Sequence, residues 1–130
     1  LEYATYCGNY YGTPKKQVEE MLERGKNVLL EIEVQGAMQM KKLCPDGVFI
    51  FIKPPSISEL KRRLKKRATE SDEVIDARVA QAKEEMKYAN KYDYVIVNDV
   101  LEKAVEDFKA IIRAEELSTK RIKVDTKEAE

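Results

Sequence analysis

The stretch Val28-Leu-Leu-Glu-Ile-Glu-Val-Gln-Gly36 decides the fold, because it is an apolar run of strand length with two carboxylates in its second half. Side chains two apart on a strand share a face, so Glu31 and Glu33 are predicted to point to the same side. A strand buried on both faces carries almost only apolar residues. The two acids therefore indicate either a ligand site at the carboxyl end of the strand or an edge strand with one face in water, and this stretch alone leaves both open.

Two further apolar runs of strand length, 48–52 and 92–97, alternate with helical patterns along the chain. This alternation indicates βαβ units with right-handed crossovers, and hence an α/β fold with a parallel sheet. Parallel strands end at one edge of their sheet, where open α/β sheets bind ligands. The residues expected to converge there are Glu33 and Gln35, Lys53 and Pro54, and Asn98 and Asp99.

The helices are predicted from the spacing of apolar residues and from capping residues. Thr13-Pro14 is a typical helix start, and Gly25 is a typical stop. Ser56 with Glu59 three residues later is typical of a capping box. The predicted helices cover about 13–25, 36–43, 56–66, 73–90 and 101–112.

Composition limits the function classes. The chain has 130 residues, which fits one domain, and its 24 basic and 24 acidic side chains cancel. A balanced chain lacks the net field that drives non-specific binding to nucleic acid or membranes. No apolar run approaches membrane-spanning length and no signal-peptide pattern is present, so we expect a cytoplasmic protein that binds neither nucleic acid nor membrane.

Histidine is absent from the sequence, which removes nucleophile systems that use it and the commonest metal ligand. The two cysteines, Cys7 and Cys44, are far apart and are expected to be separate reduced thiols. Chemistry is therefore left to carboxylates, Arg, Lys, Tyr and the backbone.

The segment 61–67 is the strongest local charge feature. Arg63 and Arg67 are four residues apart and share a helix face, and Arg78 follows beyond a polar loop. Guanidinium groups suit phosphate ligands and phosphoryl-transfer transition states, so the three predict a hinged clamp. The alternative is a solvated helix face with ordinary salt bridges, while nucleic-acid binding is disfavoured because no aromatic residues interleave with these charges.

A second candidate site lies near the start of the chain. Glu2 precedes an aromatic segment, and the hydroxyls of Tyr11 and Thr13 share one face if the segment is extended. A carboxylate that accepts two adjacent N–H groups suits guanine, whereas adenine offers no such pair. The alternative is a surface acid beside a core aromatic cluster. Asn98 and Asp99 have their own alternative, which is to cap the last helix.

The order of several motifs resembles guanylate kinase from residue 1 to about Glu116, and the ordered set is highly specific although no single motif is decisive. The motifs are Leu1-Glu-Tyr-Ala, Gly8-Asn-Tyr-Tyr-Gly-Thr13, Leu30-Glu-Ile-Glu-Val-Gln-Gly-Ala37, Pro45-Asp-Gly47, Phe49-Ile-Phe-Ile52, Pro54-Pro-Ser56 and Tyr92-Asp-Tyr-Val-Ile-Val-Asn-Asp99. The resemblance implies an α/β fold of the P-loop NTPase-like, nucleoside monophosphate kinase type. It implies a three-layer parallel sheet that lacks the P-loop strand here.

By this resemblance the activity is transfer of the γ-phosphoryl of ATP to GMP, with Mg²⁺ bound to ATP. The implied catalytic residues are Arg63, Arg67 and Arg78, the implied GMP-binding residues are Glu2, Tyr11, Thr13 and Glu33, and Asn98 is implied near the adenine of ATP. Glu31 would reach the metal through water. Residues 1–13 would end the GMP-binding subdomain, and 14–130 would form the core with a lid at about 64–75. The resemblance leaves a homodimer open.

One family motif is missing from the 130 residues, since they contain no G-x-x-x-x-G-K-[ST]. In the family this loop lies upstream of Leu1 and follows a central strand of the sheet. These residues alone are therefore expected to be inactive and to make a sheet with a vacancy, which is filled by another polypeptide segment, by a rearranged pairing or by residues outside these 130. The rival from another class is a guanylate-kinase-like module that binds proteins without catalysis.

Overall fold

The computed structural model describes residues 15–67 and 69–129. Glu2, Tyr11 and Thr13 lie outside these residues, and so does the tight turn expected near Gly8. The chain divides into two compact units, residues 1–49 and 50–130. In the part of the chain described, no helix is long and apolar enough to cross a membrane.

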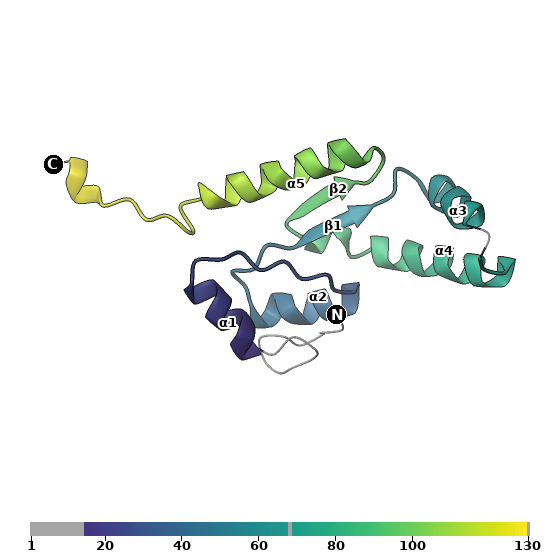
Figure 1. Cartoon of the computed structure of the whole chain (residues 1–130), viewed down its shortest axis with the longest axis horizontal. Coiled ribbons are helices and arrows are strands. Elements are labelled where there is room, and N and C mark those ends of the chain that lie inside the picture. Colours follow the sequence, from purple (N-terminus) through teal and green to yellow (C-terminus); the bar gives the residue numbers. More distant parts are fainter. Residues whose placement is uncertain (1–14, 68, 130) are drawn as a thin grey trace. The chain divides into compact units, whose positions relative to one another are not determined.

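Two helices form the described part of the first unit, α1 (Lys15–Glu23) and α2 (Val34–Leu43) (Figure 1). Gly25 follows α1 with a φ of 78°, a left-handed conformation that suits glycine. The amide of Gly25 donates to the carbonyl of Leu22 over 3.0 Å, and that of Lys26 to Met21 over 3.1 Å. The predicted stop at Gly25 is therefore confirmed.

The strand predicted at 28–36 is wrong, because residues 26–33 form no strand and α2 already begins at Val34. The period-two pattern is nevertheless present. Its apolar side, formed by Val28, Leu30 and Ile32, packs against the buried pair Val18 and Met40. Its other side is exposed and consists of Leu29, Glu31 and Glu33. An extended segment becomes a strand only when a neighbouring backbone pairs with it, and the described residues provide no such neighbour.

Cys44 at the end of α2 is disulfide-bonded. The expectation of separate reduced thiols is therefore wrong for Cys44. Cys7 is the only other cysteine of the sequence, and it lies outside the described residues.

The second unit contains a parallel pair of strands, β1 (Ile50–Lys53) and β2 (Tyr94–Val97) (Figure 1). Their register pairs Ile50 with Tyr94 and Lys53 with Val97. The amide of Asn98 donates to the carbonyl of Lys53 over 2.8 Å, which continues the pairing beyond β2. The predicted α/β class with a parallel sheet is confirmed, and so is the predicted meeting of these two strand ends.

Three α-helices accompany this sheet, α3 (Ile57–Lys66), α4 (Asp72–Met86) and α5 (Leu101–Glu116). The short 3₁₀ helix η1 (Ala89–Lys91) lies between α4 and β2, and a second one, η2 (Thr126–Ala129), follows α5. The Ser56 hydroxyl accepts a hydrogen bond from the Glu59 amide over 3.0 Å, which confirms the predicted cap of α3. The N-cap of α5 is Val100 without a side-chain bond, so the alternative that Asn98 or Asp99 caps this helix is wrong.

The buried apolar residues of the second unit come from both strands and from two helices. They are Phe51, Ile75, Val79, Ile96 and Ile111. Ile75 and Val79 are four apart on α4, as the helical spacing predicts. The Phe51 ring meets the edge of Tyr92 at 5.1 Å between centroids. These residues hold the strands and helices that carry the candidate site.

Candidate functional site

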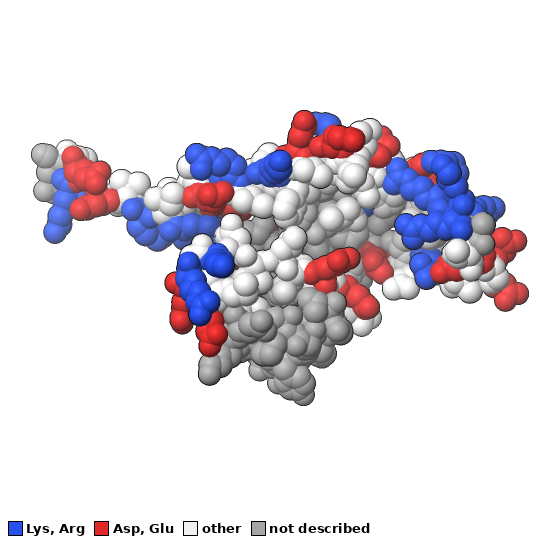
Figure 2. Space-filling model, in the orientation of Figure 1, with Lys and Arg blue, Asp and Glu red and all other residues white. Residues whose placement is uncertain are grey.

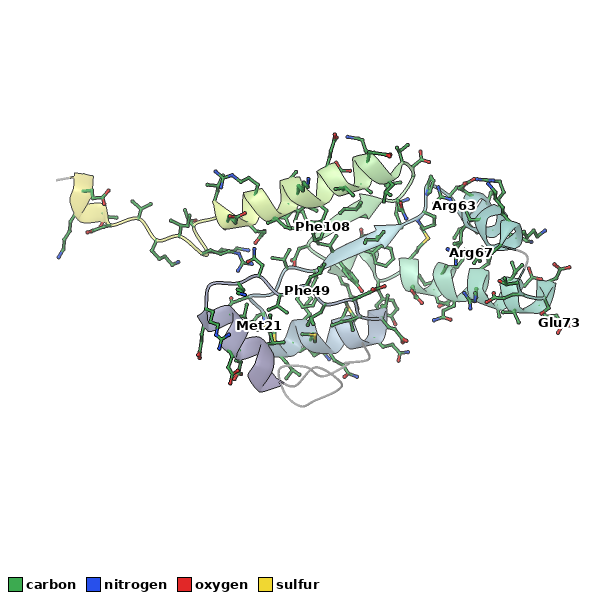
Figure 3. All side chains as sticks on the ribbon, in the orientation of Figure 1. Met21, Phe49, Arg63, Arg67, Glu73 and Phe108 are labelled. Atoms are coloured by element: carbon green, nitrogen blue, oxygen red, sulfur yellow. The ribbon has the colours of Figure 1, made fainter. Side chains whose placement is uncertain are left out.

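The candidate site lies where β1 and β2 end and α3 begins. The two prolines after Lys53 lack an amide hydrogen and so stop the ladder of β1. The Ser56 cap then starts α3 immediately beyond the strand end. Basic side chains gather over α3 in Figure 2, and Figure 3 shows Arg63 on the side of this helix near the strand ends.

Arg63 joins α3 to the loop between β2 and α5. Its Nη1 donates to the Asn98 carbonyl over 2.8 Å, and its Nη2 donates to the Asp99 carbonyl over 3.4 Å. The Nη2 group also lies 3.8 Å from a carboxylate oxygen of Asp99. The third donor, Nε, bonds to Glu59 Oε1 over 3.0 Å. Two predicted site residues, Arg63 and Asn98, are therefore in direct contact.

Glu59 lies between two guanidinium groups. Arg62 donates to it with two bonds, Nε to Oε2 at 2.9 Å and Nη2 to Oε1 at 2.6 Å, and Arg63 adds the third. The hydrogen bond from Arg62 is the largest cause that lowers the pKa of Glu59 from 4.5 to about 2. The hydrogen bond from Arg63 also lowers it, and burial opposes them less strongly than Arg62 acts. Glu59 is thus a carboxylate at any pH in the neutral range.

Arg67 and Arg78 lie on either side of the polar segment between α3 and α4. Arg67 is the exposed C-cap residue of α3. Arg78 on α4 pairs with Glu70 of the polar segment, Nη2 to Oε1 at 2.6 Å, and remains 52% exposed. Arg63 and Arg78 therefore have different partners, since Arg63 contacts Glu59 and the loop after β2, whereas Arg78 contacts the polar segment.

The remaining predicted site residues are divided between the first unit and the part not described. Glu31 and Glu33 are exposed and share one side of their extended segment, as predicted. In the described ranges no cluster of three acidic or cysteine side chains is suited to hold a metal. Sequence reasoning treated Glu59 only as a capping residue and missed its arginine partners. The spacing of three and four residues between Glu59 and the two arginines was the available signal.

Comparison with known proteins gives consistent results. The family model for guanylate kinase matches residues 1–115. A guanylate kinase of Listeria innocua is 54% identical over 122 residues, which are 94% of this chain and 60% of that protein. A guanylate kinase of Desulfitobacterium hafniense is 52% identical over 121 residues, with 93% and 60% covered. The crystal structure of guanylate kinase from Anaplasma phagocytophilum matches with a TM-score of 0.68 at 36% identity and covers 83% of this chain and 51% of that one.

Parallel strands that end beside an arginine-bearing helix, together with the match to that solved structure, define a P-loop NTPase-like α/β protein of the nucleoside monophosphate kinase type. Within that class the chain belongs to the guanylate kinase family. It spans about 60% of the length of the curated relatives that it matches.

Proposed function

We propose that this chain is the part of a guanylate kinase that supplies the arginines of the reaction, and that the whole protein transfers a phosphoryl group from ATP to GMP to give ADP and GDP. The observation that carries the proposal is the family membership over residues 1–115 together with Arg63, which is held at the carboxyl ends of β1 and β2. The substrates are inferred from family membership. Arg63 places a positive charge at the carboxyl ends of the strands, where α/β sheets bind ligands.

Arg63, Arg67 and Arg78 are the proposed catalytic residues. Phosphoryl transfer needs little covalent help from the protein, so catalysis depends on positioning and on cations near the oxygens that gain charge. Arg67 is exposed and Arg78 is half-exposed, so neither is committed to a buried structural role. The proposed lid at about 64–75 contains Arg67, and its closure over the phosphates would exclude water.

The substrate contacts are proposed on residues from several parts of the chain. Glu2 and Thr13 would bind the guanine, Tyr11 the GMP phosphate, and Glu33 the GMP side of the cleft. Asn98 would lie near the adenine of ATP. Its place beside the end of β2 supports this assignment, because nucleotides bind beyond the carboxyl ends of the strands in this class.

Mg²⁺ bound to ATP is the proposed cofactor, and Glu31 is the residue proposed to hold it through water. The exposed carboxylates of Glu31 and Glu33 are oxygen donors of the kind that Mg²⁺ prefers, so this part of the chain fits the ion chemically. When bound, the ion supplies positive charge to the transferring phosphates. Homodimer formation and a cytoplasmic location stay predictions from the sequence.

The test is turnover of the whole protein, in which this chain is joined to the remainder of the enzyme. Arg63→Ala is expected to lower the rate of GMP phosphorylation by on the order of 10²-fold or more, as for other charge-stabilising donors. Arg113→Ala is the matched control, since Arg113 is exposed on α5 away from the strand ends. An unchanged rate for Arg63→Ala would refute the catalytic assignment.

The 130-residue chain alone is a second test. It contains no G-x-x-x-x-G-K-[ST], and we expect no GDP formation from it under conditions where the whole protein turns over. A whole protein that binds neither GMP nor ATP in calorimetry, but that binds another protein, would favour the non-catalytic interaction module.

A further inference from the structure

Every nitrogen of the Arg63 guanidinium is engaged, but with acceptors of different kinds. Nε faces the carboxylate of Glu59, whereas Nη1 and Nη2 face the neutral carbonyls of Asn98 and Asp99. Arg63 is 32% exposed and Glu59 is 25% exposed, so the pair lies partly out of solvent. The ion pair with the Asp99 carboxylate is longer, at 3.8 Å, and Asp99 is 67% exposed, so this contact contributes little.

From this arrangement we infer that Glu59 is a positioning residue that holds the Nε edge of Arg63, so that its two Nη groups bind the carbonyls that follow β2 and couple α3 to the β2–α5 loop. The inference rests on the proposed function in one respect, namely that Arg63 meets a phosphate during the reaction. It assigns Glu59 a role in the site beyond that of a capping residue.

The position of Glu59 is itself fixed from two sides. Its amide donates to the Ser56 hydroxyl in the first turn of α3, where a negative charge is also favoured by the helix dipole. Its carboxylate is held by the bidentate bonds from Arg62, which is 61% exposed. Arg62 thus orients Glu59, and Glu59 orients Arg63.

Because the acceptors of Arg63 differ in charge, its Nη groups can exchange one acceptor for another while Nε keeps its own. Hydrogen bonds between a guanidinium and an anion are stronger than those to a neutral carbonyl. A phosphate that reaches the strand ends is therefore expected to take the Nη groups from Asn98 and Asp99, while Nε stays on Glu59. The loop that carries Asn98 then loses its tie to α3 at the moment when Arg63 binds the phosphate. The Arg63 side chain therefore couples α3 to the β2–α5 loop.

Amide hydrogen exchange of the whole protein without nucleotide tests the coupling. The Asn98 amide donates to the Lys53 carbonyl, so its exchange rate reports how often the β2–α5 loop opens. With Glu59→Gln or Arg63→Ala we expect exchange at Asn98 to rise by about tenfold, the effect of one lost charge-assisted hydrogen bond on a local opening. The double variant is expected to exchange no faster than Arg63→Ala alone, because both changes remove the same tie.

Ser56→Ala is the matched control, because it weakens the cap of α3 without removing any partner of Arg63. It is expected to raise exchange in the first turn of α3 and to leave Asn98 within about twofold of the wild type. Unchanged exchange at Asn98 in Glu59→Gln, or an equal rise in Ser56→Ala, would overturn the positioning role. Circular dichroism of each variant checks that the helices are retained, and Glu59→Asp replaces Glu59→Gln if that variant fails to fold.

Failure of this inference is distinguishable from failure of the proposed function. If Arg63→Ala abolishes turnover of the whole protein while Glu59→Gln leaves both Asn98 exchange and turnover unchanged, only the positioning role of Glu59 is overturned. If Arg63→Ala keeps wild-type turnover, the catalytic assignment fails, whatever the exchange shows.

Discussion

Tyr94 Oη donates a hydrogen bond of 2.5 Å to Glu115 Oε2, which joins the start of β2 to the last turn of α5. The other oxygen of the same carboxylate accepts bonds from Arg121 Nε at 3.2 Å and Nη2 at 3.1 Å. Arg121 belongs to the segment after α5, so one carboxylate ties a strand, a helix and that segment together. The hydrogen bond between Tyr94 and Glu115 raises the pKa of Tyr94 and lowers that of Glu115.

This contact predicts a loss of stability at high pH. Because the pKa of Tyr94 is raised by folding above its ordinary value of 10.0, its stabilising effect is complete below pH 10 and is lost as the pH rises through the folded-state pKa. Urea denaturation at pH 9 and pH 11 should show a larger fall for the wild type than for Tyr94→Phe. Tyr88→Phe, which removes a hydroxyl from an exposed ring, should behave like the wild type. An identical fall in wild type and Tyr94→Phe would contradict the prediction.

The cap of α3 gives a second prediction. Ser56→Ala removes the acceptor of the Glu59 amide and should lower the free energy of unfolding by about 1 kcal/mol, within a range of roughly 0.5–2. Ser58→Ala is the matched control, because Ser58 is exposed within the first turn of the same helix. Chemical denaturation followed by circular dichroism measures both. Equal effects at the two serines would mean that the capping bond contributes nothing.

The strand β2 offers two neighbouring positions with opposite environments. Ile96 is 2% exposed and Val95 is 53% exposed. Ile96→Ala should cost about 2–5 kcal/mol of unfolding free energy through lost burial and the cavity left behind. Val95→Ala should cost less than about 1 kcal/mol, because more than half of the Val95 surface stays in water.

If Ile96→Ala does not fold, Ile96→Val replaces it, with an expected cost of about 0.5–1.5 kcal/mol. Urea denaturation midpoints with unchanged slopes would show that the native packing, and not the unfolded state, has changed. A Val95 variant as destabilised as the Ile96 variant would place the core on the wrong face of β2.

The proposed guanine reader predicts a change in GMP affinity of the whole protein. Glu2→Gln keeps the shape of the side chain but replaces one acceptor by a donor, and GMP binding should weaken by roughly 1.5–3 kcal/mol. Glu23→Gln on α1 is the control, because Glu23 is an exposed acid of the same chain. Isothermal calorimetry with GMP measures both, and unchanged affinity for Glu2→Gln would remove Glu2 from the site.

The sequence predicted those elements whose signals are local. The Ser56 cap, the stop at Gly25 and the apolar strands before Lys53 and Asn98 are all confirmed. Each depends on residues close in sequence, or on a parallel partner that the chain itself contains.

The failure at 28–36 has the opposite cause. Its alternation was predicted correctly, but strand formation depends on a backbone partner, and alternation alone does not provide one. The partners of the two Arg63 Nη groups could not be predicted either, because they are backbone carbonyls 35 and 36 residues away and carry no signature in the sequence. The sequence shows which side chains can bind an anion. Only the fold shows which groups those side chains contact when no anion is bound.

The two-stranded sheet has a practical consequence for work with the chain in solution. Ile52 is 61% exposed and Val95 is 53% exposed, and among the described residues β1 pairs with β2 alone. Ile52 and Val95 lie on opposite faces of the sheet, so each face exposes an apolar side chain, and no described strand covers the outer edges of β1 and β2. Exposed apolar side chains beside open strand edges promote intermolecular strand addition. Self-association that rises with protein concentration is therefore the property to control first, and a peptide that completes the sheet should suppress it.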